Sequence, residues 1–162
     1  MKIITAIDRD RNIGYKSGLL FKIPADMRFF KEQTIGKVVV MGRKTLESLP
    51  GSRPLPDRVN IVLTRNTDYA PDGVIIAHDT DELFSFLEDY DTDQVYVIGG
   101  ESIYRLLLPY CDTAILTEID TVAEKADKKF PELDPGEWSV ESQTGTQESN
   151  GYKFQWKVYK RK

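Results

Sequence analysis

The sequence is poor in the residues that support disulfide, metal or nucleophilic chemistry. Its 162 residues include one cysteine, Cys111, and one histidine, His78. A single cysteine excludes an intrachain disulfide and a zinc site built on cysteines. No histidine lies near Cys111 in the sequence, so we expect Cys111 to be a buried apolar residue. We place His78 on a strand end or loop, and not as a catalytic base.

The chain also lacks an excess of positive charge and a long apolar run. Its formal net charge is −4, whereas broad nucleic-acid binding needs a basic face. No apolar run approaches the length of about 20 residues that spans a bilayer. The first segment becomes charged after Ile7, so we expect no signal-peptide core. These features predict a cytoplasmic protein with one domain over residues 1–162, and a monomer, because no apolar stripe demands a partner.

Short apolar runs rich in β-branched residues alternate with helical patterns along the chain. Strands are predicted at residues 2–7, 37–41, 60–64, 74–77, 94–98 and 113–119. Helices are predicted from residue 24, from residue 43 to about 49, and at 81–90 and 102–108. This alternation indicates βαβ units and a mostly parallel sheet. The period-two segments 138–143 and 153–159 predict a final antiparallel hairpin, with Trp138 and Trp156 in the core.

Residues 13–34 combine a turn-rich loop with a helix, and the acid Asp26 lies near the start of that helix. Pro24 suits the first helical position because it has no N–H to satisfy. One helix face is apolar, with residues at i, i+4 and i+7: Ile23, Met27 and Phe30. Asp26 then has two explanations. It is a first-turn acid favoured by the helix dipole, or a desolvated carboxylate that needs a cationic or hydrogen-bond-donating ligand.

Three of the predicted strands end in residues suited to phosphate. They are followed by Gly42-Arg43-Lys44-Thr45, by Thr64-Arg65 and by Gly99-Gly100. Ligands of parallel sheets bind outside the carboxyl ends of the strands, and helix N-termini there bind phosphate. The segment after Ile98 lacks the G-x-G-x-x-G fingerprint of Rossmann domains. Together the three junctions predict a site for a nucleotide with several phosphates.

Seven segments carry motifs in a fixed order along almost the whole chain. They read TAIDRDRNIG, IPADMRFFK, VVMGRKTLESL, RPLPDRVNIVLTR, VYVIGGESIY, ILTEID and KFP. In this order they resemble the dihydrofolate reductase family. The resemblance implies a three-layer sandwich with a central eight-stranded, mostly parallel mixed sheet and an antiparallel C-terminal edge strand. It also implies hydride transfer from NADPH to the pterin of dihydrofolate, which yields tetrahydrofolate for one-carbon metabolism, with antifolate inhibitors as further small-molecule partners.

The resemblance implies substrate-binding roles for individual residues. Asp26 matches the acid that binds the amino group and ring N–H of the pterin, a bidentate partner for a carboxylate. Thr117 matches the hydroxyl that hydrogen-bonds to that acid. Residues that match the walls around the pterin and benzoyl ring are Ile4, Ala6, Met27, Phe30, Leu49, Leu55 and Ile98. Arg58 matches the arginine that binds the α-carboxylate of the glutamate tail.

The resemblance implies a cofactor site as well. A lid over the nicotinamide, residues 13–22, is matched by Ile13, Gly14, Leu19 and Phe21. Leu19 and Phe21 count with Asp26 and Thr117 among the catalytic residues. The adenosine-phosphate side is matched by Gly42, Arg43, Lys44, Thr45, Thr64 and Arg65. The pyrophosphate turn is matched by Gly99, Gly100, Glu101, Ser102 and Ile103. Ala6 also faces the cofactor, and Tyr104 matches a tyrosine near the nicotinamide.

Two residues and one loop depart from the pattern of the family. Phe21 stands where a tryptophan is usual, so the lid lacks an indole N–H that would hold a water near the pterin. Leu20 replaces a proline, which we expect to loosen the lid. Residues 126–128 read Ala-Asp-Lys where Gly-Asp-Thr is usual, in a loop that normally helps to hold the lid closed.

Two other functions stay open from the sequence. One is a reductase of the same fold that acts on another pterin-like or ribosylated heterocycle. The other is a nucleotide- or folate-binding protein without turnover. Asp26 followed by Phe30, together with Arg58 for a glutamate tail, favours folate.

Overall fold

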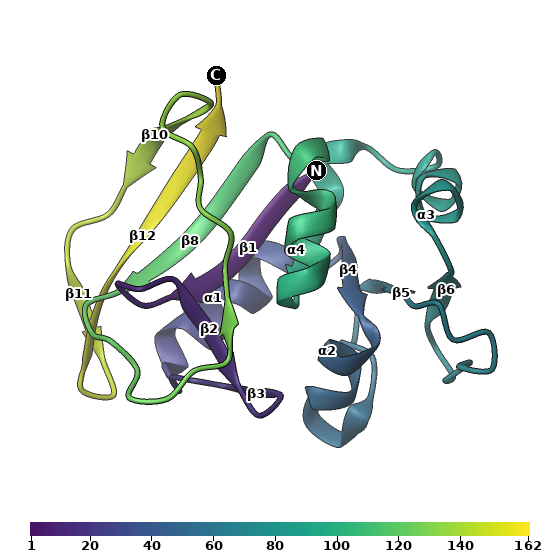
Figure 1. Ribbon diagram of the computed structural model, residues 1–162, viewed down its shortest axis with the longest axis horizontal. Helices are drawn as coiled ribbons and strands as arrows, with labels where there is room; N and C mark the ends of the chain where they lie inside the picture. The colour runs from purple at the N-terminus through teal and green to yellow at the C-terminus, as the bar shows by residue number, and fades with distance from the viewer.

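A computed structural model describes all 162 residues, and its centre is one large mixed sheet (Figure 1). Its strands are β1 (Lys2–Ile7), β4 (Val38–Gly42), β5 (Val59–Leu63), β6 (Ile75–Ala77), β7 (Val95–Gly99), β8 (Thr113–Ile119), β10 (Trp138–Gln143), β11 (Gln147–Ser149) and β12 (Tyr152–Arg161). Eight of them lie in the order β10-β12-β8-β1-β7-β4-β5-β6, and β11 pairs with β12. Pairing is parallel from β8 to β6 and antiparallel at β12. This confirms the predicted sheet and its antiparallel C-terminal edge.

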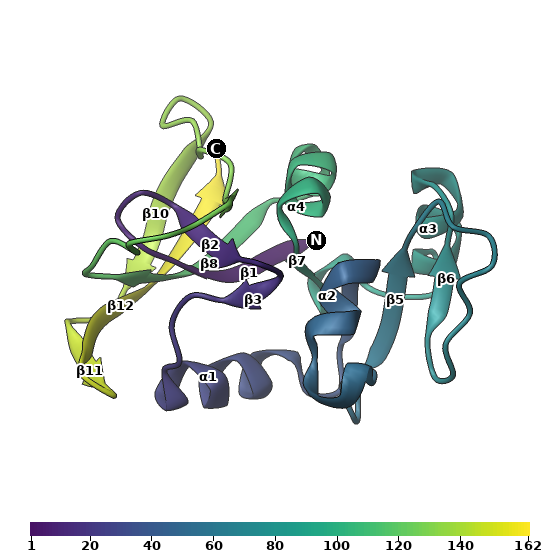
Figure 2. The same ribbon diagram turned by 60° about the horizontal axis from the view of Figure 1, so that its bottom comes forward.

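Helices cover both faces of the sheet (Figure 2). Helices α1 (Pro24–Thr34) and α2 (Arg43–Ser48) lie on one face, and α3 (Thr80–Leu87) and α4 (Glu101–Leu107) lie on the other. Short 3₁₀ turns occupy Pro50–Ser52, Thr92–Gln94 and Leu108–Tyr110. The predicted three-layer sandwich is confirmed, although α3 ends at Leu87 and not at residue 90. None of these helices has the length and apolar character that crossing a membrane requires.

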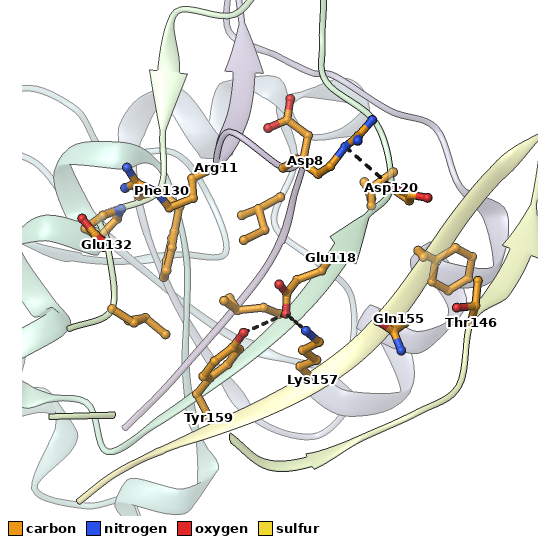
Figure 3. A pocket seen from close by; sticks show the side chains of 17 residues that line it. Asp8, Arg11, Glu118, Asp120, Phe130, Glu132, Thr146, Gln155, Lys157 and Tyr159 are labelled. Carbon is orange, nitrogen blue, oxygen red and sulfur yellow. Dashed lines mark hydrogen bonds and ion pairs between the residues drawn. The ribbon is translucent and has the colours of Figure 1, made fainter. Parts of the chain in front are cut away.

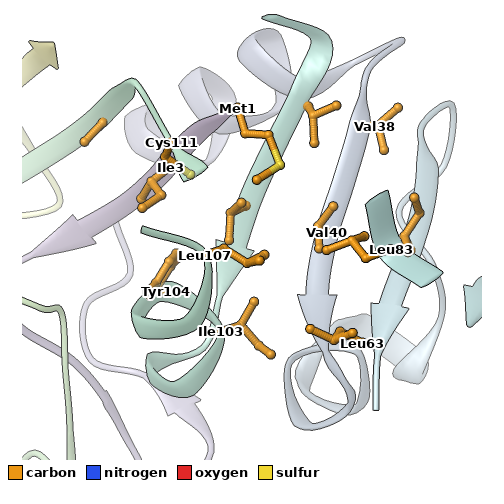
Figure 4. Packing of buried hydrophobic residues seen from close by; sticks show 14 of the residues in the cluster. Met1, Ile3, Val38, Val40, Leu63, Leu83, Ile103, Tyr104, Leu107 and Cys111 are labelled. Atoms are coloured by element: carbon orange, nitrogen blue, oxygen red, sulfur yellow. The ribbon is translucent and has the colours of Figure 1, made fainter. Parts of the chain in front are cut away.

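The core follows from the alternation of side chains along the strands. On β4, Val38 and Val40 join the cluster under α3 and α4, whereas Val39 and Met41 join the cluster under α1 and α2. A strand apolar on both faces is typical of a buried parallel sheet. Figure 4 shows the first cluster, which includes Cys111. Cys111 is buried in this cluster, so the prediction of a buried cysteine is confirmed, and burial raises the pKa of its thiol to about 11.

The lid differs from the loop that the sequence predicted. β2 (Asn12–Tyr15) and β3 (Gly18–Leu19) form a hairpin, and β9 (Lys128–Lys129) adds a third strand to make a separate small sheet. Lys16 and Ser17 make the turn with positive φ angles of 47° and 62°. The sequence pattern missed this sheet because β9 comes from a distant part of the chain and its pairing is not encoded locally.

Candidate functional site

The Asp26 carboxylate is held by side chains from two strands of the main sheet. Asp26 lies in the first turn of α1, and its Oδ1 accepts a hydrogen bond of 2.5 Å from Thr117 Oγ1 on β8. The same oxygen accepts a bond of 3.0 Å from the indole Nε1 of Trp156 on β12. Both protein donors therefore bond to Oδ1, which leaves Oδ2 to receive a ligand.

The register of the sheet explains why these two donors converge. Thr117 and Trp156 are directly paired Cα partners on the antiparallel strands β8 and β12. Opposite residues of an antiparallel pair project from the same face of the sheet. That face is the one under α1, because Ile115, two residues before Thr117, packs in the cluster that Phe29 and Phe30 of α1 also contact.

The start of α1 directs Asp26 toward the sheet. Ile23 is buried and extended before the helix, and its carbonyl accepts bonds of 3.0 Å from the N–H groups of both Asp26 and Met27. Pro24 takes the first helical position as predicted. Asp26 is thus a first-turn acid, as the first explanation holds, and it also bonds to two side chains of the sheet. The second explanation, a carboxylate that needs a ligand, stays a prediction.

Trp156 is the site residue that the sequence analysis missed. We expected it in the core, but it is only half-buried and its N–H reaches Asp26. Its ring stacks on Phe29 with centroids 4.4 Å apart and 21° between the planes. The alternation of Phe154, Trp156 and Val158 gave a signal for its face, but the sequence gave none for the strand that pairs with it.

Most of the predicted wall residues come together under α1 and α2. Ile4 is buried, and the half-buried members of the same cluster are Phe30, Leu49, Leu55 and Ile98. Ala6 packs in a neighbouring cluster around Ile23. Met27 is 55% exposed, so it contributes an apolar surface beside Asp26 and not a core contact.

Arg58 lies just before β5 with its guanidinium partly fixed. Its NH1 donates to Thr34 Oγ1 at 3.0 Å, and its Nε donates to the Pro56 carbonyl at 2.9 Å. Burial lowers the pKa of Arg58, and the adjacent Asp57 partly opposes this effect. These bonds leave other N–H groups of the guanidinium free to bind an anion.

The predicted phosphate residues gather at the carboxyl ends of β4, β5 and β7, which are neighbours in the sheet with β4 in the middle. Lys44, Arg65 and Ser102 are exposed, and Arg43 forms an ion pair of 3.5 Å with Glu47. Thr64 and Thr45 are half-buried. The sequence thus predicted correctly that these residues share one edge, which presents cations and hydroxyls together.

Gly99 has a conformation that favours glycine, with a φ of +127°. The peptide between Gly99 and Gly100 is cis. A Cβ on Gly99 would meet the Tyr104 hydroxyl at 3.3 Å, and a Cβ on Gly42 would meet Ile103 at 3.0 Å. Tyr104 donates to the Ile4 carbonyl at 3.1 Å, and burial raises its pKa, so it stays a protonated donor.

Glu101 connects the end of β7 to the lid sheet. Its Oε1 accepts a bond of 2.6 Å from the Lys129 N–H on β9, and its Oε2 accepts one of 3.3 Å from Arg105 Nε. The bond from Lys129 is the main reason why the pKa of Glu101 is lowered. We expected Glu101 only at the pyrophosphate turn, but its carboxylate also accepts a hydrogen bond from the lid sheet.

The four lid residues lie in different surroundings. Ile13 and Gly14 are part of β2, whereas Phe21 packs edge-on against Tyr152 with centroids 5.3 Å apart. Leu19 is 86% exposed, so the structure does not bring it together with Asp26 and Thr117. Asp127 holds the hairpin: its Oδ2 accepts from Lys16 N–H at 3.1 Å, and its own N–H donates to the Gly14 carbonyl at 3.0 Å.

A cavity of about 470 Å³ lies on the other face of the sheet and is not this site (Figure 3). It is lined by Leu116 and Glu118, which flank Thr117, and by Lys157, which follows Trp156. Glu118 is paired there with Lys157 at 3.3 Å and accepts a bond of 2.8 Å from Tyr159. The opposite charges of Glu118 and Lys157 in this cavity therefore neutralise each other.

Comparisons with known proteins show which proteins this chain resembles. The sequence model of the family described as dihydrofolate reductase matches residues 1–161. The dihydrofolate reductase of Bacillus subtilis is 35% identical, with 100% of this chain and 95% of the relative covered. That of Mycobacterium leprae is 43% identical over 79% of this chain and 82% of the relative. The structure of dihydrofolate reductase from Enterococcus faecalis, complexed with NADP(H) and RAB-propyl, superposes with a TM-score of 0.88 at 36% identity, covering 99% and 95% of the two chains.

Proposed function

Since the chain belongs to the dihydrofolate reductase family, we propose that the Asp26 site is where it performs the reaction of that family. This reaction is the NADPH-dependent reduction of 7,8-dihydrofolate to 5,6,7,8-tetrahydrofolate. The observation that carries the assignment is the Asp26 carboxylate, which is held by Thr117 and Trp156 with Oδ2 left for a ligand. A carboxylate in this position suits the amino group and ring N–H of a pterin, which form a bidentate pair of donors.

In this proposal Asp26 orients the substrate and stabilises its protonated form. Hydride transfer to pterin C6 requires a proton at the neighbouring N5. Asp26 is the only ionisable residue among the predicted catalytic and wall residues, because the others are apolar or carry a hydroxyl. It orients the pterin and favours the protonated substrate, and water delivers the proton. The benzoyl ring contacts the apolar wall that includes Leu49 and Leu55, and Arg58 binds the tail carboxylate, since a planar guanidinium matches a carboxylate.

The residues at the ends of β4, β5 and β7 fit NADPH, which supplies the hydride when bound. The exposed cations Lys44 and Arg65, with Arg43, suit its adenosine phosphates. Gly99 and Gly100 have no side chains, so a pyrophosphate can approach their backbone closely. The space beside Gly100 is open, because a Cβ there would meet only Thr45 Oγ1, at 3.6 Å. The buried Tyr104, bonded to the Ile4 carbonyl, lies between this edge and β1.

We extend the proposal to a cytoplasmic monomer that also binds antifolate inhibitors at the Asp26 site. Exposed large apolar residues such as Phe86, Leu106 and Val140 come from different elements. Such scattered residues are normal on a monomer. Light scattering of the purified protein tests the proposed monomer, and a mass of two chains would contradict it.

The decisive test of function follows NADPH absorbance with purified protein. We expect the absorbance to fall only when dihydrofolate is added. Consumption with another pterin-like heterocycle but not with dihydrofolate would point to a different reductase. Tight binding of NADPH and dihydrofolate without consumption would point to a binding protein.

A further inference from the structure

Trp156 supplies an indole N–H to Asp26 from a part of the fold where the family resemblance placed no donor. The lid position that usually carries a tryptophan is Phe21, and its ring packs against Tyr152. Trp156 instead reaches Asp26 Oδ1 directly from β12 at 3.0 Å. The site therefore has an indole donor whose position depends on the sheet and not on the lid.

The contacts of the Trp156 ring fix the direction of its N–H. One face stacks on Phe29 at 4.4 Å, and Phe154 meets the ring edge-on at 5.2 Å. The backbone of Trp156 is fixed as well. Trp156 pairs directly with Thr117, and its backbone N–H donates to Thr144 Oγ1 at 3.1 Å. The pairing of β8 with β12 thus fixes the positions of the two donor residues, Thr117 and Trp156, relative to each other.

We propose that Trp156 is a positioning residue for the reaction, acting through Asp26. This inference rests on the proposed role of Asp26 as the acid that binds the pterin. With Thr117 and Trp156 both on Oδ1, that oxygen has its two lone-pair directions engaged. The carboxylate plane is then fixed, its charge is favoured by two donors, and Oδ2 becomes the main acceptor for the N–H donors of the pterin.

A role in packing alone predicts a different result, and Trp156→Phe separates the two. Phenylalanine keeps an aromatic ring against Phe29 and Phe154 but removes the N–H. Loss of a hydrogen bond to a charged group is expected to lower kcat/KM for dihydrofolate at neutral pH by roughly 10- to 100-fold. Loss of a donor to the carboxylate predicts that the pH profile of kcat/KM differs from that of the wild-type protein, whereas a loss of packing alone predicts an unchanged profile.

Trp138→Phe is the matched control. Trp138 is the only other tryptophan, and it is buried in the cluster on the opposite face, with Arg161 over its ring at 4.5 Å. We expect this variant to keep the wild-type kcat/KM and pH profile. Thermal unfolding of both variants verifies that they are folded. If Trp156→Phe is folded and has the wild-type pH profile, whether or not its rate falls, Trp156 acts only by packing and the proposal is overturned.

A second measurement needs no substrate. With two tryptophans, the protein gives two indole ¹H–¹⁵N NMR signals, and Trp138→Phe identifies the one from Trp156. Asp26→Asn must shift the Trp156 signal and leave the Trp138 signal in place. An unshifted Trp156 signal would overturn the proposal. Failure of the wild-type protein to reduce dihydrofolate would contradict the proposed function, whereas the NMR signal tests the bond between Trp156 and Asp26 separately, without any turnover.

Discussion

At the residue scale, the site depends on how two charged side chains are fixed before a ligand arrives. Asp26 is held at one oxygen by Thr117 and Trp156, and Arg58 is held at two nitrogens by Thr34 and a carbonyl. Fixing a charged group in advance reduces the entropy lost when it binds its ligand. In the proposed function each residue binds a different part of the substrate with its remaining atoms, so mutation can separate the two roles.

Asp26→Asn keeps the shape of the side chain but removes its charge. We expect kcat/KM at neutral pH to fall by roughly 10²- to 10⁴-fold, as is typical of a positioned acid–base group. Activity should partly return as pH falls, because acidic solution protonates the substrate without help. A pH series of kcat/KM measures both effects. Asp81→Asn, at an exposed first-turn acid of α3, is the control, and wild-type activity of Asp26→Asn near pH 7 would falsify the assignment.

Arg58→Ala should weaken binding of dihydrofolate by roughly 10- to 100-fold, as expected for charge-assisted hydrogen bonds. Binding of NADPH should change little, because its predicted site lies at other strand ends. Arg58→Lys keeps the charge without the planar fork and should recover only part of the affinity. KM values for dihydrofolate and for a pterin without the glutamate tail provide the measurement. An equal loss for both substrates would show that Arg58 does not bind the tail.

At the element scale, Asp127 holds the strands of the lid sheet together, and the Glu101 carboxylate joins this sheet to α4. Asp127 bonds to the β2–β3 hairpin at Lys16 and Gly14, and Glu101 bonds to β9 at Lys129. The residues that flank Asp127 depart from the usual pattern, yet its bonds to the hairpin are made. The turn between β2 and β3 is itself exposed.

We predict that the lid moves on the μs–ms timescale in the free protein, as catalytic lids do. Relaxation-dispersion NMR should detect exchange in residues 14–22, where Leu20 replaces a stiffening proline. Asp127→Ala should increase the exchange because it removes the acceptor for Lys16 N–H. Asp134→Ala is the control, since Asp134 bonds only within its own turn, to Gly136 N–H at 2.8 Å. Exchange that is absent in residues 14–22, with and without ligands, contradicts the prediction.

At the scale of the whole molecule, the parallel sheet assembles the proposed cofactor edge from three separate strands. Cations that follow β4 and β5 lie beside the glycines that follow β7 because these strands are neighbours in space. No short segment contains all of these groups. The site consequently depends on the integrity of the sheet and of the loops that anchor it.

We predict a preference for NADPH over NADH from the cations at this edge. Arg43, Lys44 and Arg65 can neutralise a 2′-phosphate, and each charge-assisted bond contributes about 1.5–3 kcal/mol. Arg65→Ala should reduce the ratio of kcat/KM for NADPH to that for NADH by roughly tenfold or more. Lys31→Ala, at an exposed lysine in the last turn of α1, is the control. Equal kcat/KM values for the two cofactors in the wild-type protein would refute this preference.

Asp8 anchors the loop after β1 and makes stability depend on pH. Burial by itself raises the pKa of Asp8, but hydrogen bonds from the Ala123, Asn12 and Asp10 N–H groups and from the Asn12 side chain outweigh it, so the pKa is lowered. A lowered folded-state pKa stabilises the fold above the unfolded value near 4, and this contribution is lost as pH falls through the folded-state pKa.

Asp8→Asn should therefore lower the free energy of unfolding at pH 7 by about 2 kcal/mol, because an amide group would face two N–H donors. The difference from wild type should shrink as pH falls below about 4. Urea unfolding at several pH values measures it. Asp10→Asn, at an exposed neighbouring residue, should have little effect, and a difference that is constant with pH would contradict the linkage to Asp8.

The sequence by itself determined the features that local patterns encode. Buried strands read as β-branched runs, Pro24 marked the start of α1, and the glycines and cations after three strands marked the proposed cofactor edge. The identity of Asp26 and Thr117 as partners came from the family resemblance, and the structure confirms their hydrogen bond. Each of these features depends on a few residues that are close in the sequence, so it can be predicted without knowledge of the whole fold.

The tertiary structure alone decided the contacts that join distant segments. Asp26 and Trp156 are 130 positions apart, and Glu101 and Lys129 are 28 apart. Whether Trp156 faces Asp26 depends on the register between β8 and β12, and a slip of one residue would turn its side chain to the opposite face of the sheet. That register is set by the packing of the whole sheet, and a period-two pattern within one strand is compatible with several registers.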